Sequence, residues 1–184
     1  MRVTGGDARG RRLRPPTSAG TRPTSALVRA AVFNALATRA WEDVRVLDLY
    51  AGTGSLGIEA LSRGAQWADS VEKAPRQCAA LRENLRLAGL ENRANVYCIT
   101  VEKALETLKG PYGVVFLDPP YLAAGLDAVL ESLASGSLLT EDAVVVVEHS
   151  KHTLLKERYG ELAIARSHRY GDTVVDMLTE GGAW

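Results

Sequence analysis

The sequence is poor in cysteine and contains no long apolar run. Its two cysteines, Cys78 and Cys98, are too few for a disulfide framework, and its three histidines have no metal-ligand spacing to them. The longest apolar run, residues 143–147, is far shorter than the roughly 18 residues of a membrane helix. No apolar segment follows the charged N-terminus, which argues against a signal peptide. These absences favour a single domain of about 184 residues in a reducing cytoplasm, without membrane or metal.

Lysine is absent from the first 30 residues, which hold seven arginines and one acid, Asp7. That segment has a net charge of +6, and residues 31–184 carry −6, because the whole chain balances 22 basic against 22 acidic residues. Nucleic-acid phosphates attract such a basic arm; a solvated, partly disordered tail is the alternative. The candidate RNA-binding residues are Arg2, Arg9, Arg11, Arg12, Arg14 and Arg22.

Short apolar runs alternate with segments of helical periodicity along most of the chain. The pattern predicts strands over residues 44–49, 67–71, 95–99, 114–117, 143–148, 162–169 and 173–178, and helices over 23–37, 58–63, 75–88, 102–108 and 126–133. Such alternation indicates an α/β fold, with a mostly parallel seven-stranded sheet covered by helices on both faces. The last two strands form an antiparallel C-terminal hairpin around Gly171-Asp172. Ligands of such folds bind at the carboxyl ends of the strands, where the strand order reverses.

A glycine-rich loop follows the first of these strands. Gly52, Gly54 and Gly57 form a G-x-G-x-x-G pattern, and Glu72 ends the next strand, where its carboxylate can accept hydrogen bonds from ribose hydroxyls. The pattern fits a dinucleotide or an adenosyl ligand, and an empty tight turn is the structural alternative. Asp48, just before the loop, favours S-adenosylmethionine, because its carboxylate would repel a pyrophosphate but attract a sulfonium and an ammonium.

The tetrapeptide Asp118-Pro119-Pro120-Tyr121 ends the fourth strand. The two prolines lock the backbone and remove two N–H donors, so the Asp118 carboxylate and the Pro119 carbonyl are offered as acceptors. Together they can hold both N–H bonds of a nucleobase amine and direct its lone pair at a methyl group, with Tyr121 stacked on the base. A simple turn with a packed tyrosine is the alternative.

These motifs resemble those of the bacterial 16S ribosomal RNA guanine-N2 methyltransferases, the small-subunit rRNA methyltransferase D type. The likeness runs through residues 2–10, Thr21-Arg22-Pro23-Thr24, residues 47–54, the tetrapeptide, and Tyr170-Gly171-Asp172-Thr173. It implies a class I methyltransferase domain over residues 23–184, an RNA-contacting arm over residues 1–22, and S-adenosylmethionine as donor. The implied acceptor is N2 of one guanine in 16S rRNA, and the implied protein is a cytoplasmic monomer that acts on the small ribosomal subunit or its assembly intermediate.

The resemblance also assigns residues to the site. The implied catalytic residues are Asp118, Pro119, Pro120 and Tyr121, and the implied cofactor-binding residues are Asp48, Tyr50, Gly52, Gly54, Glu72, Thr100, Val101 and Asp118. Thr100 is a departure, because many relatives have Asp or Asn there to meet the adenine amine; the Thr100 hydroxyl or the Val101 N–H is expected to bind the adenine here. The rival functions are a DNA adenine-N6 or cytosine-N4 methyltransferase, a protein-glutamine methyltransferase, a nucleotide-dependent oxidoreductase and a non-catalytic RNA-binding protein.

Overall fold

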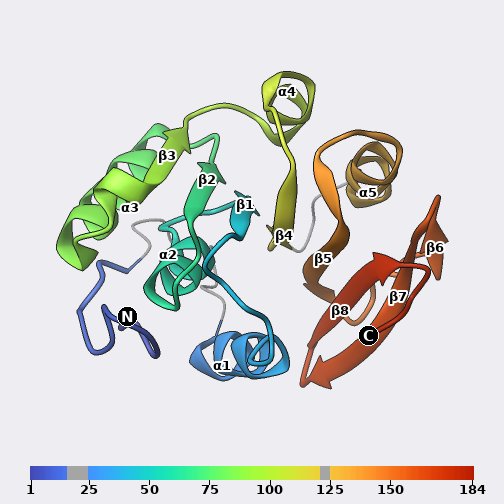
Figure 1. The fold of residues 1–184 in the computed structure, drawn as a ribbon, viewed down its shortest axis with the longest axis horizontal. Coiled ribbons are helices and arrows are strands. Elements are labelled where there is room, and N and C mark those ends of the chain that lie inside the picture. The colour runs from blue at the N-terminus through green and yellow to red at the C-terminus, as the bar shows by residue number, and fades with distance from the viewer. Residues whose placement is uncertain (16–24, 121–124) are drawn as a thin grey trace.

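A single mixed sheet organises the chain, and the computed structural model describes it over residues 1–15, 25–120 and 125–184. Its strands are β1 (Arg45–Leu49), β2 (Trp67–Val71), β3 (Ala94–Tyr97), β4 (Tyr112–Leu117), β5 (Leu139–Ser150), β6 (Arg158–Tyr159), β7 (Leu162–Tyr170) and β8 (Thr173–Glu180). They lie in the order β3-β2-β1-β4-β5-β8-β7-β6 (Figure 1). Strands β1 to β5 pair in parallel, and β8, β7 and β6 continue the sheet antiparallel. The predicted α/β class and antiparallel hairpin are confirmed.

The strand count differs by one from the predicted seven. The additional strand, β6, has two residues that pair with the start of β7. A pattern of alternating side chains needs at least four residues to be visible in a sequence, so a two-residue edge strand gives no such signal.

Helices cover both faces of the sheet. They are α1 (Ala26–Ala35), α2 (Ser55–Ser62), α3 (Pro75–Ala88), α4 (Val101–Thr107) and α5 (Leu126–Ser135), with a short 3-10 turn over Glu91–Arg93. Helices α1 to α3 lie on one face, and α4 and α5 on the other (Figure 1). Ser25 caps α1 by accepting a hydrogen bond from the Val28 N–H, and Gly89, in a left-handed conformation, ends α3.

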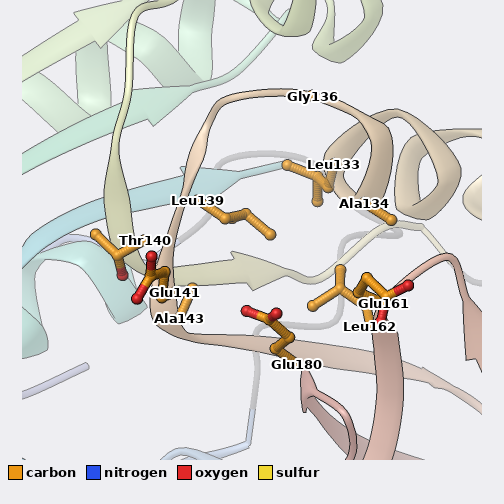
Figure 2. Close-up of a pocket in the computed structure, with 10 residues that line it drawn as sticks. All are labelled: Leu133, Ala134, Gly136, Leu139, Thr140, Glu141, Ala143, Glu161, Leu162 and Glu180. Atoms are coloured by element: carbon orange, nitrogen blue, oxygen red, sulfur yellow. The ribbon is translucent and has the colours of Figure 1, made fainter.

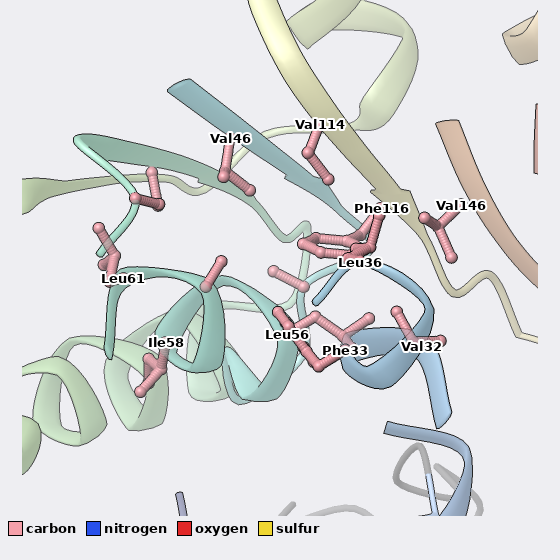
Figure 3. Close-up of a cluster of buried hydrophobic side chains, with 14 of the residues drawn as sticks. Val32, Phe33, Leu36, Val46, Leu56, Ile58, Leu61, Val114, Phe116 and Val146 are labelled. Atoms are coloured by element: carbon pink, nitrogen blue, oxygen red, sulfur yellow. The ribbon is translucent and has the colours of Figure 1, made fainter. Parts of the chain in front are cut away.

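The core is split by the sheet into two apolar layers. All six residues of β4 are buried, as expected for a strand covered on both faces. On the α1 and α2 side, Phe116 of β4 packs against Phe33 of α1, with ring centroids 5.7 Å apart (Figure 3). Because β1 and β4 are buried almost throughout, their polar functional residues lie at the ends of the strands.

The N-terminal segment packs against the body. Val3, Ala8 and Leu13 are buried, and Arg2 and Arg12 form an antiparallel bridge that closes residues 1–13 into a hairpin-like loop. The buried carboxylate of Glu59, on α2, accepts hydrogen bonds from the backbone N–H groups of Thr4 and Gly5 at 2.8 Å. The alternative of a solvated tail is therefore wrong for residues 1–15. The predicted boundary at residue 22 lies outside the described residues.

Candidate functional site

The two motifs meet where the strand order reverses. β1 connects onward to β2 on one side and has β4 on its other side (Figure 1). In open α/β sheets, ligands bind beyond the carboxyl ends of the strands at such a reversal of strand order. The last register pair is Leu49 with Leu117. The next residues, Tyr50 and Asp118, therefore start the glycine loop and the tetrapeptide side by side.

Each glycine of the loop has its own structural reason. Gly54 has φ +84°, and a Cβ there would lie 2.9 Å from the Leu81 side chain, so the loop packs tightly on α3. A Cβ on Gly57 would lie 3.1 Å from the Asp48 carboxylate. Gly52 has φ +55° and would meet nothing within 4 Å, which leaves the approach to its backbone open. Tyr50 shares the left-handed conformation, with φ +62°, an uncommon strain for a residue with a side chain.

Three carboxylates converge beside this loop. Asp48 is buried, and its Oδ2 accepts a hydrogen bond from the Gly57 N–H at 2.9 Å. Burial raises the pKa of Asp48 to about 7; the Gly57 N–H opposes this, and the charges of Asp118 and Glu72 raise it further. The site therefore has an excess of negative potential, which a cationic ligand would relieve and a pyrophosphate would aggravate.

Glu72 shapes the loop as well as facing it. Its Oε2 accepts a hydrogen bond from the Gly52 N–H at 3.0 Å, and its Oε1 accepts one from the Ala74 N–H at 2.7 Å. Each carboxylate oxygen can accept a second bond, so the predicted role toward ribose hydroxyls stays a prediction. The bond to Gly52, which sequence reasoning missed, links the end of β2 to the glycine loop.

The start of α4 forms the third corner. Thr100 is its N-cap, and its hydroxyl accepts a hydrogen bond from the Lys103 N–H at 3.3 Å. Val101 is buried in the first turn, where helical N–H groups have no acceptor within the helix. The pKa of Tyr50 is raised by burial and by the charge of Glu102, which places this helix start near the glycine loop. Both residues predicted to contact adenine, Thr100 and Val101, therefore lie at the start of α4, and their role toward adenine stays a prediction.

The tetrapeptide is described as far as Pro120. Asp118 is half-buried, Pro119 is buried and Pro120 is exposed. Tyr121 lies outside the described residues. Because β4 is buried throughout and ends at Leu117, the Asp118 carboxylate is the first polar side chain that β4 presents beyond the core.

The arginines of the arm lie on the surface over α2 and α3. Arg2, Arg9, Arg11, Arg12 and Arg14 are all exposed, and Arg22 lies outside the described residues. Three of the exposed side chains have protein partners: Arg2 donates to the Gly10 carbonyl, Arg11 to the Leu87 carbonyl, and Arg14 pairs with Glu83 at 3.4 Å. With Val3, Ala8 and Leu13 turned inward, the hairpin presents its charge to the solvent.

A cavity of about 220 Å³ lies elsewhere, between α5, the start of β5 and the β7–β8 pair (Figure 2). Its rim carries Glu141, Glu161 and Glu180, and none of the predicted site residues lines it. Strand β5 begins here, so the cavity lies at the amino end of this parallel strand. The two motifs follow the carboxyl ends of the parallel strands, at the opposite end of the sheet. Within the described ranges, no three His, Cys, Asp or Glu side chains are grouped to hold a metal ion, and no helix there is long and apolar enough to cross a membrane.

Fold and site together define a class I methyltransferase fold with a glycine loop and an Asp-Pro-Pro segment at its switch point. The family model described as Conserved hypothetical protein 95 matches residues 1–179. The chain belongs to this family, which includes the small-subunit ribosomal RNA methyltransferases of type D.

Individual relatives cover most of the chain. The Bacillus subtilis protein YlbH is 35% identical over 99% of this chain and 100% of its own length. Its name describes it as an rRNA methyltransferase by inference. Ribosomal RNA small subunit methyltransferase D of Escherichia coli is 36% identical over 80% of this chain and 74% of its own length. The solved structure of the Escherichia coli protein YhhF, titled as an inferred methyltransferase, has a TM-score of 0.86 and 31% identity, covering 99% of this chain and 98% of that chain.

Proposed function

We propose that this protein transfers a methyl group from S-adenosylmethionine to the exocyclic N2 amine of a guanine in the 16S rRNA of the small ribosomal subunit. The observation that carries the proposal is the juxtaposition of Asp48, the glycine loop and Asp118 at one switch point. The names of the relatives, which include small-subunit rRNA methyltransferases, support the RNA class of the substrate.

The charge of the site supports the cofactor. S-adenosylmethionine supplies an activated methyl group on a positively charged sulfur and carries no phosphate. Its two positive groups match the surplus of carboxylate at Asp48, Asp118 and Glu72. Glu72 would accept from the ribose hydroxyls, the N–H of Val101 would meet the adenine, and Asp48 would lie toward the methionine end. Tyr50, Gly52 and Gly54 would line the loop, while Thr100 fixes the start of α4.

The tetrapeptide would hold the acceptor. Guanine N2 has two N–H bonds, and Asp118 and the Pro119 carbonyl would accept one each. These bonds orient the amine and keep its lone pair in line with the methyl carbon. Positioning of this kind can by itself accelerate methyl transfer strongly. As the new N–C bond forms, the C–S bond breaks and its electrons stay on the sulfur. The amine proton then passes to Asp118 or to water. Pro120 would stiffen the segment and Tyr121 would stack on the base.

The arm would hold the RNA backbone. Its exposed arginines lie on a segment that packs against α2 and α3, where Arg11 contacts Leu87 and Arg14 contacts Glu83. Phosphate contacts of this kind fix the register of a protein on its RNA without reading sequence. A base in a stack offers no straight path to the methyl group, so the target guanine must be unpaired or turned out.

The test is methylation of small ribosomal subunits from cells that lack this protein. With S-adenosylmethionine, the wild-type protein should produce N2-methylguanosine, identified by mass spectrometry of the digested rRNA. Asp118→Ala should abolish the product while the protein still binds the cofactor by calorimetry, and the exposed Asp43→Asn should retain full activity. Methylation of duplex DNA or of a protein glutamine instead, or substantial turnover by Asp118→Ala, would overturn the proposal.

A further inference from the structure

Asn84 is a polar side chain on the buried face of α3, with an exposed fraction of 0%. Its Oδ1 accepts a hydrogen bond from the Arg14 N–H at 2.7 Å. Its Nδ2 donates to the Thr53 carbonyl at 2.9 Å and to the Arg14 carbonyl at 3.2 Å. Both amide hydrogens are thus used on backbone oxygens of two different segments, which makes Asn84 a bridge between them.

The two bridged segments have different parts in the proposed reaction. Arg14 belongs to the basic arm, 70 residues before Asn84. Thr53 stands between Gly52 and Gly54 in the glycine loop, and it is itself buried. Leu81, one turn before Asn84 on α3, packs on Gly54 of the same loop. The conformation of the loop is therefore fixed from α3, and the arm shares that anchor.

The arm is also attached to α2, the helix that begins where the loop ends. Glu59 accepts the N–H groups of Thr4 and Gly5, and Ser62 accepts the Ala8 N–H at 2.9 Å and donates to the Gly5 carbonyl. The arm thus spans both helices that flank the glycine loop. A displacement of the arm on binding RNA would act on the loop directly through Asn84, and on α2 through Glu59 and Ser62.

We propose that Asn84 is a positioning residue that couples the RNA-binding arm to the cofactor loop. The inference rests on the proposed function, since it takes the arm as the RNA contact and the loop as the cofactor contact. RNA on the arm favours the arrangement of Thr53 that binds the cofactor, and by thermodynamic reciprocity the cofactor favours RNA binding by the same factor. The substrate therefore helps to order the loop on which its own methylation depends.

The experiment measures this coupling directly. The dissociation constant of S-adenosylhomocysteine, which cannot react, is determined with and without small subunits from cells lacking this protein. For the wild type we expect subunits to tighten binding by at least about fivefold, within the usual range of coupling between sites. Asn84→Asp keeps the shape and the acceptor for the Arg14 N–H, but its carboxylate cannot donate to Thr53 or Arg14. Its ratio should fall below about twofold.

A matched control is Glu83→Gln, on the neighbouring position of α3. It removes the exposed ion pair with Arg14 but leaves the bridge to Thr53 in place, so the ratio should equal that of the wild type. A ratio that survives in Asn84→Asp, or that falls equally in Glu83→Gln, overturns the role of Asn84. A wild-type ratio near one overturns the coupling itself.

Hydrogen exchange of the wild-type protein provides a test without any substitution. Addition of small subunits should slow amide exchange in residues 50–57 even without cofactor, and unchanged exchange there would contradict the coupling. Failure of the proposed function has a different signature, because then no N2-methylguanosine forms on small subunits at all. Methylation with no coupling refutes the inference and leaves the function standing.

Discussion

The Asp48 carboxylate and the Gly57 backbone N–H are joined by a hydrogen bond of 2.9 Å. It links the end of β1 to the first turn of α2, where N–H groups need an acceptor from outside the helix. The bond favours the ionised form of Asp48, but burial and the charges of Asp118 and Glu72 outweigh it and raise the pKa to about 7. The protein thus keeps a carboxylate beside the glycine loop, at the proposed methyl-donor site, in a place where ionisation costs free energy.

Stability should therefore fall as the pH rises from about 4 to about 7. In the unfolded chain Asp48 has its ordinary pKa of 3.8 and is ionised in that interval. In the folded protein its pKa is raised to about 7, so it is protonated there. The folded state binds more protons, so its advantage is lost as pH increases and levels off above about 7. Asn at this position still accepts from Gly57, so Asp48→Asn should raise the free energy of unfolding at pH 8 by on the order of 2–4 kcal/mol. Urea unfolding at pH 5 and pH 8 measures both effects; a smaller gain at pH 8 than at pH 5 would contradict the assignment.

The same carboxylate should make cofactor binding depend on pH in the opposite direction. A cationic ligand prefers ionised Asp48, so the affinity for S-adenosylmethionine should rise about tenfold from pH 5.5 to pH 7, with release of a proton. The ligand's own α-amino group stays charged there, since such groups have a pKa near 7.7–8.0. Calorimetry in two buffers of different ionisation enthalpy measures affinity and proton release. In Asp48→Asn the affinity should be weaker and almost flat with pH; a slope equal to that of the wild type would place the relevant proton elsewhere.

Glu72 holds the glycine loop and is proposed to accept hydrogen bonds from the ribose hydroxyls, and two substitutions test this assignment. Removing its charge-assisted hydrogen bonds costs on the order of 1.5–3 kcal/mol, so Glu72→Ala should weaken S-adenosylmethionine binding by roughly 10- to 150-fold. Glu72→Gln retains one acceptor but brings an amide N–H against the N–H of Gly52 or Ala74, so its loss should be intermediate. Fluorescence or calorimetric titration gives the values, with the exposed Glu91→Ala as control. An unaltered dissociation constant in Glu72→Ala would mean that the adenosine lies elsewhere.

The sequence predicted most of the fold because its signals were local and strong. The strands ending at Leu49 and Leu117 are short apolar runs. The first is followed by glycines, whose backbone is unusually free, and the second by prolines, whose backbone is rigid. Their order along the chain implied parallel pairing, which brought Asp48 and Asp118 to one edge. The loop over residues 121–124, including Tyr121, lies outside the described residues, so its predicted stacking role stays a prediction.

What the sequence did not reveal are contacts between distant segments made by polar groups inside helices. Glu59 and Asn84 sit at positions of an apolar helix face, and nothing in the 3.6-residue period tells that their partners are backbone groups of residues 4, 5 and 14. The charge of the arm predicted a partner for its arginines but not its docking, because Val3, Ala8 and Leu13 are too widely spaced to form a recognisable pattern. The available signal in the sequence was the presence of polar residues at positions of the apolar helix face. Their partners can be identified only once the tertiary structure is known.

The docked arm makes a quantitative prediction about salt. Arg9 and Arg12 are exposed on the hairpin, so each can reach a phosphate without unfolding the segment. If both arginines neutralise phosphates, Arg9→Ala and Arg12→Ala should each reduce the slope of log affinity against log salt concentration by about one. Each should also weaken binding to small subunits, whatever the RNA sequence at the contact. Arg158→Ala is the matched control, because Arg158 is also exposed but lies on β6, the last strand of the sheet on the side away from β3. Filter binding between 50 and 300 mM KCl gives the slopes. Equal slopes for Arg12→Ala and Arg158→Ala would remove the arm from the RNA interface, since only phosphates contacted in the complex release counterions.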